Sequence, residues 1–227
     1  MTDSLIDCKS MKKLKIAVLV SGSGSNLQVM IDAMQAGRLP IEIVGVVSNV
    51  ADAYAVTRAN NAGIRTVVLS HVPNGKKMGI KTFEKHTLEL LNEWMPDLVV
   101  LAGFMRVLSA EFIAAVPCAM INLHPSLLPN YKGLDTHERV LKSGDKLHGC
   151  SVHVVTAELD AGQVLTQAVL AVKQNESSEL LRLRVQKLEH QLVPFTLELI
   201  AKDVLSLDKD VISDNLALPY RLWLSDY

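Results

Sequence analysis

Short apolar runs alternate with helical patterns along most of this chain, and this alternation is the feature that most restricts its fold. Apolar segments lie at 14–20, 41–47, 65–69, 97–103 and 118–123. Between them, apolar residues recur at helical spacing, and a glycine or proline closes each pattern. Strands that are buried on both faces and joined by helices are typical of parallel sheets. The sequence therefore predicts a doubly wound, mostly parallel α/β sheet of the Rossmann-like type.

Beyond residue 145 the pattern changes. Two β-rich runs, 149–156 and 163–172, are joined by AELDAG and predict a hairpin at the sheet edge. A long helix over about 177–202, kinked at Pro194, is expected next, followed by a tail of short strand and coil. We interpret residues 12–227 as one domain and 1–11 as a disordered extension. Residues 70–79, which contain one Pro, two Gly, one Asn and two Lys, predict a mobile surface loop.

Charge and cysteine usage restrict the function. Lys and Arg number 23 against 24 Asp and Glu, for a net charge of −1, which argues against a nucleic-acid surface. No apolar run approaches the roughly 20 residues of a membrane span. The three cysteines are widely spaced, with no Cys-x-x-Cys and no metal-ligand pattern. We therefore expect a cytoplasmic protein with reduced cysteines and no metal.

A glycine-rich loop, VSGSGSNLQ (20–28), follows the first strand and opens the first helix. Free N–H groups at a helix N-terminus favour an anion, so Gly24, Ser25 and Asn26 are candidates for binding a phosphate. The loop lacks the third glycine of a dinucleotide fingerprint and the lysine of a Walker motif. It is either a phosphate loop of unspecified type or a tight strand-to-helix turn without a ligand.

Asn122 and His124 lie two residues apart at the end of a buried strand, so their side chains project in the same direction. Ligands of open α/β sheets bind at such strand ends. An amide and a protonated imidazole are both donors and can stabilise an oxyanion. A carboxylate nearby would keep the imidazole charged, and Asp160 is the best candidate. The alternatives, a turn histidine and a turn aspartate, stay open from spacing alone.

The other histidines have simpler interpretations. Thr136 is the expected N-cap of a helix whose first turn contains His137. His153 faces either the site or the sheet surface. The rest are expected to face solvent; they are His71, His86, His148 and His190. No Gly-x-Ser-x-Gly elbow is present, so the nucleophile of any acyl chemistry is expected to come from a substrate.

Three segments together resemble one family, the folate-dependent phosphoribosylglycinamide formyltransferases of purine biosynthesis. They are VSGSGSNLQ, LAGFMRVLSAEFI leading into NLHPSLLPNYKGLDTH, and HGCSVHVVTAELDAGQVLTQ. The resemblance runs from about residue 14 to at least 195. It implies the formyltransferase fold and transfer of a formyl group from 10-formyltetrahydrofolate, a co-substrate, to the amine of glycinamide ribonucleotide. The implied partners are these small molecules, and the protein is expected to be a monomer or homodimer.

The resemblance also implies the site residues. The catalytic trio falls on Asn122, His124 and Asp160. The ribonucleotide contacts fall on Gly24, Ser25, Asn26, Gln186 and Glu189, although the last two would otherwise suit the solvated face of a helix. Expected folate contacts are Met105, Arg106, Val107, Leu108, Thr156, Ala157, Glu158, Leu159 and Lys81, and residues expected to support the site are His137, His153 and Asp135.

Two departures from the family's pattern matter. The family often has a histidine where this chain has Asp135, and an aspartate supplies no cationic donor at neutral pH. The family's basic folate contact aligns poorly here, and Lys77 is as good a candidate as Lys81. Rival interpretations are a formyltetrahydrofolate hydrolase and a non-catalytic nucleotide sensor. A methionyl-tRNA formyltransferase is expected to carry a further RNA-binding domain and a basic face.

Overall fold

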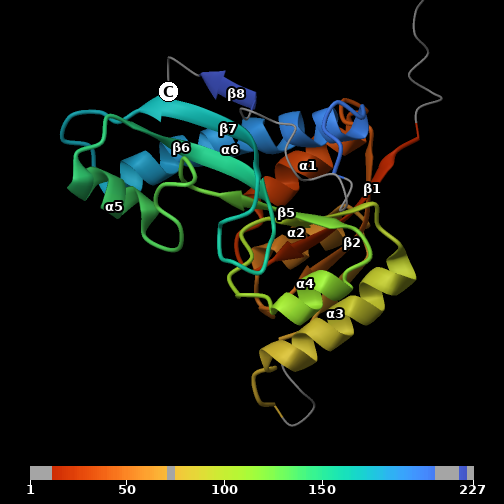
Figure 1. Cartoon of the computed structure of the whole chain (residues 1–227). Helices are drawn as coiled ribbons and strands as arrows, with labels where there is room; N and C mark the ends of the chain where they lie inside the picture. Colours follow the sequence, from red (N-terminus) through yellow and green to blue (C-terminus); the bar gives the residue numbers. More distant parts are fainter. Residues whose placement is uncertain (1–11, 71–74, 208–219, 224–227) are drawn as a thin grey trace, which may run out of the picture.

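The structure, a computed structural model, describes residues 12–70, 75–207 and 220–223. Eight strands form one sheet in the order β3-β2-β1-β4-β5-β6-β7-β8 (Figure 1). The strands are β1 (Leu14–Val20), β2 (Ile41–Ser48), β3 (Thr66–Val68), β4 (Leu98–Leu101), β5 (Ala119–His124), β6 (Leu147–Val154), β7 (Val164–Ala171) and β8 (Tyr220–Trp223). The helices are α1 (Ser25–Gln35), α2 (Tyr54–Asn61), α3 (Ile80–Trp94), α4 (Ala110–Ala115), α5 (Thr136–Ser143) and α6 (Ser178–Ala201).

The first five strands are parallel and are connected by helices, which confirms the predicted doubly wound sheet. β6 runs antiparallel to both β5 and β7, so the predicted late hairpin is also confirmed. β8 adds a parallel strand beside β7. The carboxyl ends of β1, β4 and β5 therefore lie at one edge of the sheet, where the glycine loop and the Asn122–His124 pair leave it.

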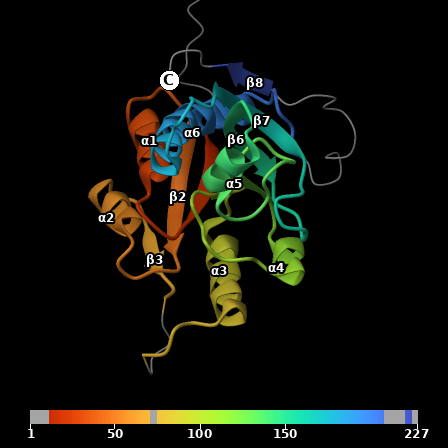
Figure 2. The same ribbon diagram turned by 90° about the vertical axis from the view of Figure 1, so that its left-hand side faces the viewer.

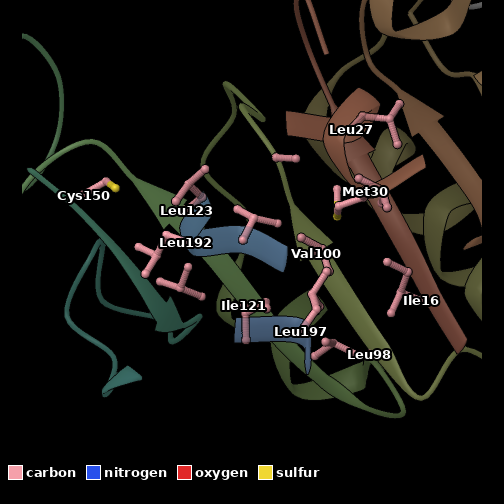
Figure 3. Close-up of a cluster of buried hydrophobic side chains, with 14 of the residues drawn as sticks. Ile16, Leu27, Met30, Leu98, Val100, Ile121, Leu123, Cys150, Leu192 and Leu197 are labelled. Atoms are coloured by element: carbon pink, nitrogen blue, oxygen red, sulfur yellow. The ribbon is translucent and has the colours of Figure 1, made fainter. Parts of the chain in front are cut away.

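Alternating side chains of the strands supply two hydrophobic cores. In β1, Ile16 and Val18 face one core, whereas Ala17 and Leu19 face the other. Helices α1, α2, α5 and α6 contribute to the first core, and α3 and α4 to the second (Figure 2). In the first core, Leu27 and Met30 of α1 and Leu192 and Leu197 of α6 lie over the sheet (Figure 3).

The long helix and the 70–79 loop can be compared with their predictions. α6 continues through Pro194 without a break in the helix. Met78 N–H donates to the carbonyl of Ser70 at 2.8 Å, so the described ends of the 70–79 loop are joined. The predicted mobile centre of that loop and the predicted disordered 1–11 lie outside the described residues, as do 208–219 and 224–227. Within the described part of the chain, no helix has both the length and the apolarity that crossing a bilayer requires.

Candidate active site

The three residues expected to carry the chemistry meet at the carboxyl end of β5. Asn122 and His124 alternate along the strand, and Asp160 lies in the connection between β6 and β7. His124 Nδ1 lies 3.4 Å from Asp160 Oδ2. Both residues are buried, with 5% and 8% of their surface exposed. The connection places Asp160 in the left-handed region, at φ 49°, which turns its carboxylate toward the strand ends.

His153 faces this cluster rather than the sheet surface. Its Nδ1 lies 2.9 Å from the carbonyl of Val154, and its Nε2 lies 3.0 Å from Asn122 Nδ2. In the tautomer that donates from Nδ1 to this carbonyl, Nε2 is an acceptor for the Asn122 amide. Nε2 is also 3.6 Å from Asp160 Oδ1. His153 therefore fixes one N–H of Asn122 and leaves the other amide positions for a ligand.

Two backbone groups complete the surroundings of His124 and Asp160. The carbonyl of Tyr131 lies 3.0 Å from His124 Nε2, and the N–H of Gly133 donates to Asp160 Oδ2 at 2.9 Å. Both come from the segment between β5 and α5, which therefore closes over the pair. A backbone contact has no side-chain signature, so sequence reasoning missed both groups.

Protonation differs from the sequence expectation. Burial lowers the pKa of His124 below its ordinary value and outweighs the Tyr131 carbonyl and Asp160, both of which raise it. Asp160 does raise the pKa of His124, as predicted, but the prediction that it keeps the imidazole charged is wrong, because burial outweighs it. For Asp160, burial raises the pKa, but His153, the Gly133 N–H and His124 together lower it below its usual value. At neutral pH the pair is a carboxylate beside a neutral imidazole.

A cavity of about 680 Å³ opens at this cluster. Asn122, His124, His153 and Asp160 all line it. So do most of the expected folate contacts, namely Met105, Arg106, Val107, Leu108, Thr156, Ala157, Glu158 and Leu159. The walls are largely apolar, with a few convergent polar groups, as expected of a site for a small molecule.

Neither lysine proposed for the folate lines the cavity. Lys81 lies in the first turn of α3, and Lys77 is exposed ahead of it. Arg106 does line the cavity, and its Nη1 donates to the carbonyl of Met78 at 3.2 Å, with the guanidinium over the Phe83 ring. The described part of the 70–79 loop is thus joined to the cavity wall through Arg106.

The glycine loop and α6, which both carry residues expected to contact the ribonucleotide, are joined by side chains. Gln186 Nε2 donates to Ser25 Oγ at 3.1 Å, and Asn26 Nδ2 donates to Glu189 Oε2 at 2.9 Å. Burial raises the pKa of Glu189, although the Asn26 hydrogen bond opposes it. Asn26 Oδ1 is buried and has no partner within the described residues, so it can accept from a ligand.

One side chain connects this loop to the cavity. Ser21 Oγ–H donates to Asn49 Oδ1 at 2.5 Å and accepts the N–H of Met105 at 2.8 Å. The helix face of Gln186 also continues one turn back to Arg182, which lines the cavity. Sequence reasoning missed Arg182, although its spacing of four from Gln186 is a usable signal.

The histidine expectations need correction. His148 was predicted to face solvent, but it is completely buried in β6, and its Nε2 lies 3.0 Å from His137 Nδ1. Burial lowers the pKa of His148 to about 3. His190 is half-buried, with a buried Nε2. The side chain of His86 is 44% exposed and faces solvent as predicted. His71 lies outside the described residues.

The start of α5 also differs from its prediction. The N-cap is Asp135, at φ 57°, and Thr136 is the first helical residue. His137 still lies in the first turn, as predicted. The Asp135 side chain makes no capping hydrogen bond and lines the cavity. The described residues hold no group of three or more His, Cys, Asp or Glu suited to a metal ion.

Comparisons with known proteins found similar sequences and a similar fold. The model of the formyl transferase family matches residues 14–197. A phosphoribosylglycinamide formyltransferase of Escherichia coli is 38% identical over 94% of this chain and 100% of that protein. A trifunctional purine biosynthetic protein adenosine-3 of Bos taurus is 40% identical over 88% of this chain, which spans only 19% of that longer protein. The crystal structure of phosphoribosylglycinamide formyltransferase from Anaplasma phagocytophilum superposes with a TM-score of 0.82 at 35% identity, covering 95% of this chain and 100% of that one.

Proposed function

The chain belongs to the formyl transferase family, and on this premise we propose that it transfers the formyl group of 10-formyltetrahydrofolate to the amine of glycinamide ribonucleotide, a step of purine biosynthesis. The observation that carries the proposal is the meeting of Asn122, His124 and Asp160 in one cavity. That cavity is connected through Ser21 to a glycine loop suited to a phosphate. Both substrates thus have a place beside the same three side chains.

The reaction needs no covalent enzyme intermediate. The substrate amine attacks the formyl carbon, and the carbonyl oxygen becomes an oxyanion. The free N–H of the Asn122 amide stabilises this charge, because the other amide hydrogen is held by His153. Collapse of the tetrahedral intermediate breaks the bond from the formyl carbon to the folate nitrogen. The amine loses one proton and the folate nitrogen gains one.

His124 and Asp160 handle that proton. The carboxylate of Asp160 is ionised at neutral pH because its pKa is lowered, so it can hold a water that accepts the amine proton. Negative charge developing on the formyl oxygen favours protonation of His124, whose two nitrogens already face oxygen acceptors. His124, neutral before the reaction, takes up the amine proton through this water and stabilises the oxyanion as a cation. It then gives the proton to the folate nitrogen as the intermediate collapses.

The substrates are placed by the surrounding segments. The first turn of α1, with Gly24, Ser25 and Asn26, takes the ribonucleotide phosphate. Gln186 and Glu189 of α6 support that turn, and we assign them to the sugar next to the phosphate. The folate lies in the apolar cavity between the 105–108 and 156–159 segments. Binding two substrates side by side also supplies a proximity contribution to the rate.

A formyl-transfer assay tests the proposal. The protein is incubated with a formyl-folate analogue, with and without glycinamide ribonucleotide, and release of free folate is followed by absorbance. Release that requires the ribonucleotide is expected. Release without it would indicate a formyltetrahydrofolate hydrolase, and no release would indicate a nucleotide sensor.

Because Cys118 and Cys150 are free thiols, we place this reaction in the reducing cytoplasm.

A further inference from the structure

Arg58 of α2 reaches across to the glycine loop, although neither its spacing nor its helix connected it to the site. Its Nε–H donates to the carbonyl of Ser23 at 2.8 Å, and its Nη1 donates to Gln28 Oε1 at 3.0 Å. The guanidinium therefore spans the turn before α1 and the side of the first turn of that helix. The Cζ atom of the guanidinium lies 4.7 Å from the centre of the Tyr54 ring.

The base of α2 is fixed to the same loop. The N–H of Ala55 donates to the carbonyl of Gly22 at 3.1 Å. Gly24 adopts φ 68°, and a β-carbon there would lie 2.6 Å from that of Ala55. Backbone contacts on one side and the Arg58 fork on the other thus hold the loop in a single arrangement. In this arrangement the first N–H groups of α1 have no capping side chain.

The charge of Arg58 is not neutralised by a direct ion pair. Among the described residues, no carboxylate lies within ion-pair distance of its guanidinium. Gln28 separates it from an acid: Gln28 accepts from Arg58 and donates from Nε2 to Asp32 Oδ1 at 2.8 Å. The first turn of α1 contains no acidic residue. His190, the nearby titratable group, has a pKa lowered by burial and then by Arg58, so it adds no competing charge.

An unpaired cation beside the positive end of a helix is electrostatically unfavourable unless an anion joins them. We propose that Arg58 is a positioning residue for the ribonucleotide phosphate. It holds the glycine loop in its observed arrangement, and its unpaired charge lies beside that loop. This inference rests on the proposed function and concerns one half of it, the choice of a phosphorylated substrate. The carbonyl of Ser23 and the amide of Gln28 orient the guanidinium. Arg58 therefore contributes to phosphate binding through the position of the loop and through the electrostatic field of its charge, and not at the reacting atoms.

Two substitutions separate charge from packing. Arg58→Gln removes the charge and shortens the fork. Gln28→Glu leaves Arg58 in place but sets a carboxylate beside it, at a half-buried position of α1. Arg58→Lys keeps the charge. The matched control is Arg65→Gln, which removes the same charge from a residue paired with Glu93 at 2.8 Å and located at the opposite end of the β3 strand from the loops of the site.

The probe is ribose 5-phosphate, titrated by calorimetry, together with steady-state transfer using glycinamide ribonucleotide. We expect Arg58→Gln and Gln28→Glu each to weaken phosphate-probe binding and raise the ribonucleotide KM about 10-fold, while kcat and the folate KM stay near wild type. Arg58→Lys and Arg65→Gln should bind within about 3-fold of wild type. Binding in the two test variants should also depend less steeply on salt, because one cation no longer acts on the phosphate.

Different results would contradict the proposed function and the inference about Arg58. If wild type neither binds ribose 5-phosphate nor uses the ribonucleotide, the proposed function fails. If wild type does both and Gln28→Glu binds equally well, the unpaired charge is not what acts, and the inference about Arg58 is overturned. The same conclusion follows if Arg58→Gln lowers kcat while leaving phosphate affinity unchanged. Circular dichroism of each variant establishes that it is folded before binding is compared.

Discussion

The imidazole of His124 and the carboxylate of Asp160 lie 3.4 Å apart between Nδ1 and Oδ2, although one ends β5 and the other lies in the turn after β6. Both are almost fully buried. A buried acid beside a histidine is a weak device for stability, because desolvation opposes the attraction. In a cavity wide enough for a substrate, the pair is better suited to moving a proton.

Asp160→Asn tests that role. The amide keeps the shape of the side chain but can neither attract a proton nor hold a relay water as a base. We expect turnover to fall by about 100-fold or more while the KM for ribonucleotide changes little. Steady-state kinetics with both substrates measures this. The control is Glu93→Gln, an exposed carboxylate paired with Arg65, which should transfer at the wild-type rate. Wild-type turnover in Asp160→Asn would remove this residue from the mechanism.

The protonation of His124 can be measured directly. Its pKa is lowered by burial, with Asp160 acting in the opposite direction. In an imidazole-labelled sample followed by NMR, we expect His124 to titrate below 6.5 in the free protein. In Asp160→Asn the opposing carboxylate charge is gone, so the pKa should fall further. A rise in that variant would mean that Asp160 does not stabilise the charged ring.

Asn26→Ala tests the ribonucleotide end of the site. The substitution removes the hydrogen bond to Glu189 and the buried Oδ1 that has no partner among the described residues. It also leaves Glu189, whose pKa burial already raises, without a donor that lowers it. We expect affinity for glycinamide ribonucleotide to fall about 10-fold, with folate binding unchanged. Equal affinity in a direct titration would count against the assignment of this loop to the phosphate.

Most of the fold could be predicted because its signals are local. The apolar run 14–20 has hydrophobic residues on both faces, and Ile16 and Leu19 do enter opposite cores. Parallel pairing then follows from the intervening helices. Helix ends are less certain: Thr136 was expected to cap α5, but the chain turns at Asp135, where a left-handed residue makes the cap without a side-chain bond.

The site was predictable only where side chains carry the signal. Asn122 and His124 can be recognised from the sequence because they lie two residues apart at a strand end, with side chains on the same face. His148 does not, because burial of a histidine depends on which strands flank it, and β6 lies between β5 and β7. The contacts of Tyr131 and Gly133 are made by backbone, which any residue provides. Arg58 was missed because the connection of α2 to the glycine loop is tertiary.

Gly45→Ala should destabilise the protein. Gly45 lies in β2, and a β-carbon there would be 2.3 Å from the Trp94 ring, which packs in the second core. Either the ring or the strand must move, so we expect the free energy of unfolding to fall by about 1–3 kcal/mol. Urea denaturation at neutral pH measures the change. Gly22→Ala, where nothing lies within 4 Å of the added carbon, is the control. Equal stability of wild type and Gly45→Ala would show that the Trp94 ring can move aside without lowering the free energy of unfolding.

His148 should make the protein sensitive to acid. Its side chain is fully buried, and its pKa is lowered to about 3 in the folded protein, against about 6.5 in an unfolded chain. Below pH 6.5 the unfolded chain binds a proton that the folded protein does not, so stability present above 6.5 is lost as pH falls toward 3. Each pH unit in that window should cost up to about 1.4 kcal/mol.

Urea denaturation at pH 7.5 and pH 5 provides the measurement. We expect His148 to account for a loss of about 2 kcal/mol between the two conditions, since about 1.5 units of that interval lie below 6.5. In His148→Gln, whose side chain does not titrate, the loss should shrink by about that amount. His86→Gln, which replaces an exposed histidine, should keep the wild-type difference. If His148→Gln loses as much stability as wild type, the ring must take up its proton equally well in the folded and unfolded protein. Its contact with His137 would then have to be reinterpreted.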